Sequence, residues 1–152
     1  MLTHLFFPTL SGVRVDRLWR EGATIHLAVV ATRRHARCPF CQRRAKRVHS
    51  HYERTLADLP CSGDRVTLHL RVRRFVCRVR WCCRKIFAER LPDLTAPFAR
   101  RTTRFTDHLV RAAFDLGGEG GARHLIAEGT PVSARTLLRL VRAAPLPIAG
   151  PV

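Results

Sequence analysis

Alternating apolar and polar positions are clearest in RVTLHLRVRRF, residues 65–75. A period of two is typical of a strand with one buried face, so this segment predicts a half-buried strand with a strongly basic outer face. The apolar face comprises Val66, Leu68, Leu70 and Val72, and the outer face comprises Arg65, Thr67, His69, Arg71 and Arg73.

Two further strands are predicted before this one. Residues 13–19 (VRVDRLW) and 24–32 (TIHLAVVAT) alternate or are rich in β-branched side chains, and Glu21-Gly22 between them is typical of a hairpin turn. The segment CSGD, residues 61–64, has the composition of a second turn. Residues 12–90 therefore predict a small antiparallel β unit. Its apolar bulk comes from Trp19, Phe75, Trp81 and Phe87.

The period becomes helical after the proline-containing segment LPDLTAP, residues 91–97. Apolar positions then recur at spacings of three and four, which predicts an amphipathic helix that the glycine run 117–121 ends. The glycine run is not a phosphate-binding loop, because no Gly-Lys-Ser or Gly-Lys-Thr follows it and no strand precedes it. The stripe comprises Phe98, Thr102, Phe105, Leu109, Ala113 and Leu116.

Two shorter helices are predicted after the glycine run. The first spans Ala122 to Glu128 and stops at Gly129. Ser133 is a typical N-cap for the second, which continues to about Ala143. Helix, glycine turn and capped helix predict a helix-turn-helix with a longer turn than the tightest version.

The last helix has an apolar and a basic side. Leu137, Leu138 and Val141 are expected to pack inward. A basic stripe at i, i+4 and i+7 would enter the major groove of duplex DNA, the alternative being an ordinary amphipathic helix with a solvated face. The stripe comprises Arg135, Arg139 and Arg142.

The cysteine spacing points to a metal site. Cys38 and Cys41 form a C-x2-C pair in CPFC, and Cys77 and Cys82 form a C-x4-C pair in CRVRWC. Two such pairs suit one tetrahedral zinc ion. The alternatives are buried cysteine pairs without an ion and a redox CxxC, and no thioredoxin-like βαβ pattern supports the latter.

Other candidate ligands lie nearby. Cys83 is the alternative to Cys82 as the fourth ligand, and Cys61 is expected to be a turn residue. His49 and His51 are expected to be partly exposed strand residues, since four cysteines already complete a closed site.

The charge balance indicates a polyanionic partner. The chain of 152 residues has 28 basic and 11 acidic side chains, a formal net charge of +17. Such a surface attracts nucleic acid or an anionic membrane surface. The sequence lacks both a run of about 18 apolar residues and a signal-peptide pattern, so we expect a cytoplasmic protein with no membrane partner.

The motifs also carry a family resemblance. CPFC, RVHSHYERTLADLP and VRRFVCRVRWC followed by RKIFAERLP resemble the zinc-binding segment of ISL-three family insertion-sequence transposases. APFARRTTRF, LGGEGGARHLIAEG and PVSARTLLRLVR resemble the helix-turn-helix segment of that family, and the resemblance covers residues 35–144. The family's zinc ligands match Cys38, Cys41, Cys77 and Cys82. The sequence CRVRWCC departs from it, because the family has a more polar segment and a proline or polar residue in place of Cys83.

The resemblance implies an α+β protein of the bacterial nucleoid. It implies a zinc-binding β domain over 1–92, a helix-turn-helix domain over 93–144, and a tail or truncated linker over 145–152. The implied function is recognition of the terminal inverted repeats of an insertion sequence in double-stranded DNA, with a second copy or the intact transposase as a further partner. The DNA-contacting residues would be Ser133, Arg135, Arg139 and Arg142 in the last helix and Arg65, Arg71 and Arg73 in the strand.

The family's catalytic domain has an RNase H-like fold in which three acidic residues hold two divalent ions. None of the eleven acidic residues here matches those positions, so we expect a truncated transposase that is not an enzyme. The alternatives are a zinc-ribbon adaptor for an acidic protein partner, a transposase acting as part of a split chain, and a thiol oxidoreductase.

Overall fold

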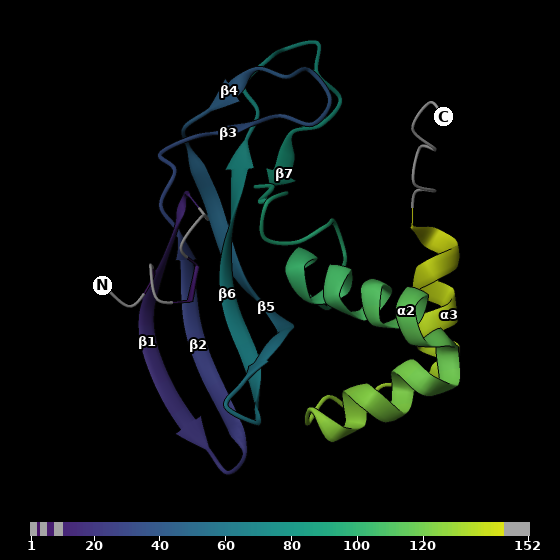
Figure 1. Ribbon diagram of the computed structural model, residues 1–152. Helices are drawn as coiled ribbons and strands as arrows, with labels where there is room; N and C mark the ends of the chain where they lie inside the picture. Colours follow the sequence, from purple (N-terminus) through teal and green to yellow (C-terminus); the bar gives the residue numbers. More distant parts are fainter. Residues whose placement is uncertain (1–2, 4–5, 8–10, 145–152) are drawn as a thin grey trace.

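The computed structural model describes residues 3, 6–7 and 11–144, and the expected tail at 145–152 lies outside them. Figure 1 shows a curved sheet with a short strand pair at one end and helices beside the β5 edge. This arrangement confirms the α+β class. Within the described residues, no helix is long and apolar enough to cross a membrane.

The main sheet has five strands, and four of them follow the order β1-β2-β6-β5. The fifth, β7, pairs with β6. Among the described residues, four strand pairs are antiparallel, but β2 and β6 pair in parallel, which corrects the expectation of a wholly antiparallel unit. The reason is the connection: β2 reaches β6 only through β3, β4 and β5, and such a crossover permits parallel pairing. The strands are β1 (Val13–Glu21), β2 (Thr24–Ala31), β3 (Ala36–Arg37), β4 (Arg44–Ala45), β5 (Val48–Cys61), β6 (Asp64–Val76) and β7 (Ile86–Ala88).

One face of the sheet is the core, as the alternation in β6 predicts. Val66, Leu68, Leu70 and Val72 are each at most 3% exposed. They pack with apolar residues of β1, β2 and β5 and with Leu91 and Leu94. On the other face of β6, Arg65 and Arg71 are exposed, and Thr67, His69 and Arg73 are half-buried.

The turn between β5 and β6 follows the prediction for CSGD. Cys61 pairs with Asp64, and the two residues between them, Ser62 and Gly63, have φ values of 53° and 82°. Positive φ at both central positions is the type I′ geometry that matches the twist of a hairpin, and glycine adopts it without steric cost.

Helix α2 (Thr103–Ala127) starts later than the sequence predicts and consists of two helical stretches joined by a kink at Gly117. Thr102 is its N-cap, whereas Phe98, the first residue of the predicted stripe, lies outside the helix with φ at 61°. The first helical stretch ends in the glycine run, as predicted: Gly117 leaves helical geometry, at φ 71° and ψ 177°, and a second helical stretch follows this kink to Ala127.

Close packing explains why the second helical stretch starts within the glycine run, whereas the sequence predicts it from Ala122. A Cβ at Gly121 would meet the Ala112 carbonyl oxygen at 3.1 Å and Leu137 at 3.2 Å, and one at Gly118 would meet Leu138 at 3.1 Å. The missing side chains therefore let the second half of α2 approach its first half and α3. Tertiary packing here outweighs the low helix propensity of glycine.

Helix α3 (Ala134–Ala143) has the predicted start. The Ser133 side chain accepts a hydrogen bond from the Thr136 backbone N–H at 3.3 Å, which confirms the N-cap. Leu137 is fully buried and Val141 is partly buried, but Leu138 is 46% exposed, so its predicted inward packing is wrong. A ten-residue helix buries one narrow stripe, and Leu138 lies beside that stripe.

The helical segment is attached to the outer edge of β5. The Ala57 backbone bonds to Arg100 and Thr102, at 2.9 and 3.0 Å. The buried Asp58 carboxylate accepts hydrogen bonds from the Thr102 hydroxyl at 2.6 Å and the Arg104 guanidinium at 2.8 Å. Asp58 thus links the sheet to the first turn of α2.

Candidate metal centre

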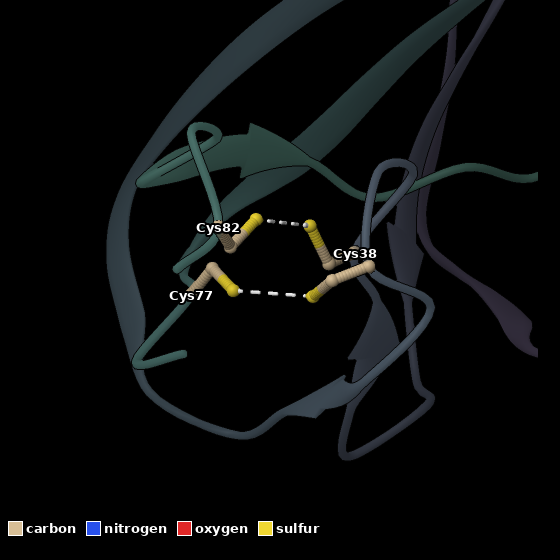
Figure 2. A group of neighbouring side chains, drawn as sticks. Cys38, Cys77 and Cys82 are labelled. Atoms are coloured by element: carbon tan, nitrogen blue, oxygen red, sulfur yellow. Dashed lines mark hydrogen bonds between the residues drawn. The ribbon is translucent and has the colours of Figure 1, made fainter. Parts of the chain in front are cut away.

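Four cysteines meet where the ends of two short hairpins face each other. Cys38 and Cys41 lie between β3 and β4, and Cys77 and Cys82 lie between β6 and β7. Figure 2 shows Cys38 on one strand connection facing Cys77 and Cys82 on the other. Residues 36 positions or more apart in the chain therefore contribute to one cluster.

The sulfur positions fit one tetrahedral ion. Sγ of Cys38 lies 3.7 Å from Sγ of Cys82, and Sγ of Cys41 lies 3.6 Å from Sγ of Cys77. All four sulfurs lie within 4.8 Å of one another. Four thiolates about 2.3 Å from a zinc ion would be separated by about 3.8 Å, whereas a disulfide would require about 2.05 Å. The cluster therefore fits one structural zinc ion.

Backbone hydrogen bonds shape the first knuckle. The Cys38 N–H donates to the Arg43 carbonyl, and the Gln42 N–H donates to the Cys38 carbonyl, each at 2.9 Å. Gln42 has φ at 58°, so the chain reverses just after Cys41. These contacts turn both sulfurs of the C-x2-C pair toward the same point.

The second knuckle is closed in a similar way. The Cys77 N–H donates to the Lys85 carbonyl at 2.8 Å, and the Cys82 N–H donates to the Val79 carbonyl at 3.2 Å. The Lys85 ammonium donates to the Val79 and Arg80 carbonyls at 3.2 and 3.0 Å. Lys85 thereby holds the loop between the two cysteines.

An apolar shell surrounds the cysteines. Cys38, Cys77 and Cys82 are at most 5% exposed, and they pack with Ala45, Phe75 and Phe87. The Phe75 and Phe87 rings stack with centroids 6.1 Å apart. Of the aromatic residues predicted as apolar bulk, Phe75 and Phe87 form part of the support of the metal site, whereas Trp81 is 69% exposed, so the prediction is wrong for Trp81.

The thiols differ in acidity. Burial raises the pKa of Cys38, but hydrogen bonds from the backbone N–H groups of Cys41 and Phe40 and from the side chains of Cys41 and Cys82 together outweigh it and lower that pKa to about 7. Burial raises the pKa of Cys82 to about 12, and the neighbouring thiols add to the rise. Four thiolates therefore require a cation among them, which a divalent metal supplies.

The remaining candidate ligands lie outside the cluster. Cys82 provides the fourth sulfur, whereas Cys83 and Cys61 are exposed. His49 and His51 are exposed on β5, as predicted for polar strand residues. Among the described residues, the four cysteines form the one group of three or more metal-ligating side chains.

The arginines expected to contact DNA occupy two places. Ser133, Arg135, Arg139 and Arg142 lie at the start and along the exposed side of α3, and the three arginines line one open groove with Glu119. Arg65 and Arg71 are exposed on the open face of β6.

Arg73 on the same strand has a carboxylate partner. Its guanidinium lies 2.7 Å from the carboxylate of Glu89, which is buried, and its backbone N–H donates to the same side chain at 2.9 Å. This ion pair was not evident in the sequence, because Glu89 lies 16 residues further along, just beyond β7.

Arg101 is a candidate that the sequence analysis missed. It lines a pocket of about 170 Å³ between the sheet and the helices, together with Arg65. Partial burial lowers the pKa of Arg101, and the positive charge of Arg139 lowers it further. Arg101 therefore lies between the basic positions of β6 and those of α3; the RR pair at 100–101 was the available signal.

Comparison with known families identifies the cysteine segment. Residues 34–83, about a third of the chain, match the zinc-finger of transposase IS204/IS1001/IS1096/IS1165. The matched segment contains all four clustered cysteines. The resemblance to the zinc-binding region of these transposases is thereby confirmed. The chain has no match among curated proteins or solved structures.

Proposed function

Since residues 34–83 match the zinc-finger of a transposase family, we propose that the chain is the DNA-binding part of an insertion-sequence transposase. Its ligand is duplex DNA carrying the terminal inverted repeats of the element. Residues 1–92 and 93–144 act as the zinc-binding and helix-turn-helix domains. The protein works at the bacterial nucleoid, alone or with a second copy or an intact transposase.

The observation that carries the DNA proposal is the basic face of α3. Arg135, Arg139 and Arg142 are exposed, and none has a carboxylate partner within ion-pair distance among the described residues. Unpaired guanidiniums on one helix face, in a chain with net charge +17, provide donors for phosphates and guanine edges.

The helices around this face have the order of a helix-turn-helix. The second half of α2 ends at Ala127, Gly129 turns the chain at φ 79°, and Ser133 caps α3. Leu125 and Leu137 are fully buried where the two helices pack. This packing supports α3 as the recognition helix, since it fixes the basic face relative to the rest of the molecule.

The proposed contacts divide by position. Arg135 and Arg139 read base edges, because residues in the N-terminal part of a recognition helix reach deepest into the groove. Arg142 and Ser133 contact phosphates at the two ends of α3. Arg65 and Arg71 contact flanking phosphates, and Arg73, bound to Glu89, contributes charge from a fixed position.

The test compares variants of the arginines proposed to contact base edges with variants of those proposed to contact phosphates. Wild type and variants are titrated with a terminal-repeat duplex and a random duplex at several salt concentrations. Arg139→Ala is expected to weaken repeat binding by about 5- to 150-fold and random binding far less. Arg71→Ala is expected to weaken both about equally, with the salt slope lowered by about one.

Arg14→Ala, on edge strand β1, is the matched control, because it removes one exposed charge that already pairs with Asp16. It is expected to leave the ratio of repeat to random affinity unchanged. If Arg135→Ala and Arg139→Ala also leave that ratio unchanged, α3 is not the reader and this assignment is wrong.

The proposed role is binding without strand cleavage. Zinc bound by four thiolates has no open position for water, so it is structural and not catalytic. Purified zinc-loaded chain, incubated with supercoiled plasmid and Mg²⁺ or Mn²⁺, is expected to leave the plasmid intact. Metal-dependent nicking that co-purifies with the chain would overturn this part of the proposal.

A further inference from the structure

A second basic site lies next to the zinc knuckles. A pocket of about 480 Å³ opens between the end of the sheet, β7 and residues 89–98. Leu70, Val72, Phe87 and Leu91 give it an apolar lining, and each of these residues is buried. The volume is in the range of small-ligand sites, and far too small for a duplex.

Four guanidiniums surround this apolar lining, and none of them has a carboxylate within ion-pair distance among the described residues. The one carboxylate of the pocket, Glu89, is already bound by Arg73. The pocket is therefore strongly positive and suits an anionic ligand. The four residues are Arg54, Arg74, Arg84 and Arg90.

Two aromatic rings accompany the arginines. The Arg74 guanidinium lies 4.8 Å from the centre of the Tyr52 ring, and that of Arg90 lies 5.7 Å from the centre of the Phe98 ring. Both rings line the pocket. Phe98 is 90% exposed, so most of its surface is open to a ligand.

Phe98 combines that exposure with an unusual backbone. Its φ of 61° is in the left-handed region, which bulky side chains rarely adopt. The strain is not balanced by burial, since the ring packs against little of the protein. A strained backbone that presents an aromatic ring to solvent is a feature of ligand-binding sites.

We infer that this pocket binds an unpaired nucleotide of single-stranded DNA. The base stacks on Phe98 over the apolar lining, and the adjoining phosphates bind the four arginines. Alternating aromatic and guanidinium groups are the usual means of holding single strands, because every base has a π face. The inference rests on the proposed DNA-binding function and adds a site distinct from α3.

Residues in and next to the two zinc knuckles form one wall of this pocket. Pro39 lies inside the first knuckle, and Arg84 and Ile86 follow directly after the second. Loss of zinc would release both knuckles, so single-strand binding at the pocket depends on the metal. Recognition by α3 has no such contact with the knuckles.

The test uses the full zinc-loaded chain and two fluorescent ten-nucleotide strands with equal phosphate number, oligo(dT) and its abasic analogue. Wild type is expected to bind oligo(dT) about 5- to 150-fold more tightly than the abasic strand, which is the factor that the stacking energy of one base gives. Phe98→Ala is expected to remove this difference. Phe114→Ala, which removes another exposed phenylalanine outside the pocket, is expected to retain it.

A second variant separates binding from folding. Phe98→Gly relieves the left-handed backbone, so its melting temperature is expected to equal or exceed that of wild type while the preference for oligo(dT) is lost. Arg90→Ala is expected to weaken binding of both strands, whereas the control Arg14→Ala weakens neither by more than about twofold.

Equal wild-type affinity for the two strands, or a preference that survives both Phe98 variants, would overturn the inference. The duplex proposal is tested separately, since Arg139→Ala is expected to leave the oligo(dT) preference intact and Phe98→Ala to leave the repeat-to-random ratio intact. A failed duplex assay together with a retained, Phe98-dependent preference would therefore refute the α3 assignment alone.

Discussion

Adjacent cysteines at 82 and 83 illustrate how much depends on a single residue. Cys82 is 1% exposed and belongs to the metal cluster, whereas Cys83 is exposed. The spacing in the sequence permits either as a ligand. The structure separates them because the Cys82 backbone bonds to Val79 and turns its side chain toward Cys38.

Replacing each cysteine tests this distinction. Cys82→Ser is expected to lower zinc affinity by more than about 100-fold, because loss of a ligand exceeds the 10- to 100-fold effect of losing an outer contact. Cys83→Ser is expected to change it little. Competition with a chromogenic chelator measures both, and a larger loss in Cys83→Ser would move the fourth ligand to that position.

Asp58 is expected to be the most sensitive acidic residue for stability. It is 3% exposed and holds Thr102 and Arg104. Asp58→Ala removes the partner of both groups and is expected to lower the free energy of unfolding by about 3 kcal/mol. The exposed pair of Asp16 with Arg14 is worth about 0–1 kcal/mol, so Asp16→Ala is the control. Equal losses in urea unfolding would contradict the assigned role of Asp58.

At the scale of single residues, the sequence predicts sites built from neighbouring positions better than contacts between residues far apart in the chain. The cysteine spacing was enough to predict the cluster, since a knuckle is a local feature. The Arg73–Glu89 pair and the Asp58–Arg104 contact join different elements, and no local pattern marks them. The sequence therefore predicts Arg73 as a DNA-contacting residue, and it does not predict the buried carboxylate of Glu89 that Arg73 binds in the structure.

At the scale of the helix, replacing two glycines of the run in α2 by alanine is expected to change the stability in opposite directions. Gly117 has φ 71° and ψ 177°, a conformation that is essentially restricted to glycine. Gly117→Ala is expected to destabilise the protein by about 1–3 kcal/mol. Gly120 lies in the helix, where a Cβ would meet only Leu116 at 3.5 Å, so Gly120→Ala is expected to stabilise by about 0.5–1 kcal/mol.

Thermal or urea unfolding of the two variants checks this pair. If both variants changed the stability in the same direction, the helix would not bend at Gly117. The sequence pattern placed the end of the first helix correctly near 116–117 but not the continuation, because the close contacts of Gly118 and Gly121 with α3 and Ala112 are tertiary.

The strands, too, could be predicted in their local features but not in their distant partners. The alternation in 65–75 gave both the position of β6 and its buried face, since burial imposes a period of two. The parallel neighbour β2 was not predictable, because partner choice depends on how the intervening knuckle and β5 cross the sheet.

At the scale of the whole molecule, the described residues form three separate apolar clusters, and each stabilises its own part of the fold. One lies under the main sheet, one lies among the helices, and one surrounds the cysteines. Only the third contains the zinc ligands, so chelation is expected to act locally. Amide exchange followed by mass spectrometry should show lost protection in 36–47 and 77–88 and retained protection in β1, β2 and α2.

Uniform loss of protection after chelation would contradict this division and would make the metal essential for the entire fold. A matched sample with zinc restored serves as the control, because thiol oxidation during chelation would prevent recovery. Zinc-dependent folding on the order of 10 kcal/mol is known for small thiolate sites, and here much of the chain has other cores.

The central claim, that the chain recognises the ends of an insertion sequence, is tested most directly by selection from a random duplex library. Zinc-loaded wild-type chain is carried through several rounds of binding and sequencing. We expect one enriched motif that occurs in inverted orientation on both sides of the chain's own reading frame, and no enrichment with Arg139→Ala. A library that stays unenriched with wild type, or a motif absent from those flanks, would contradict the account.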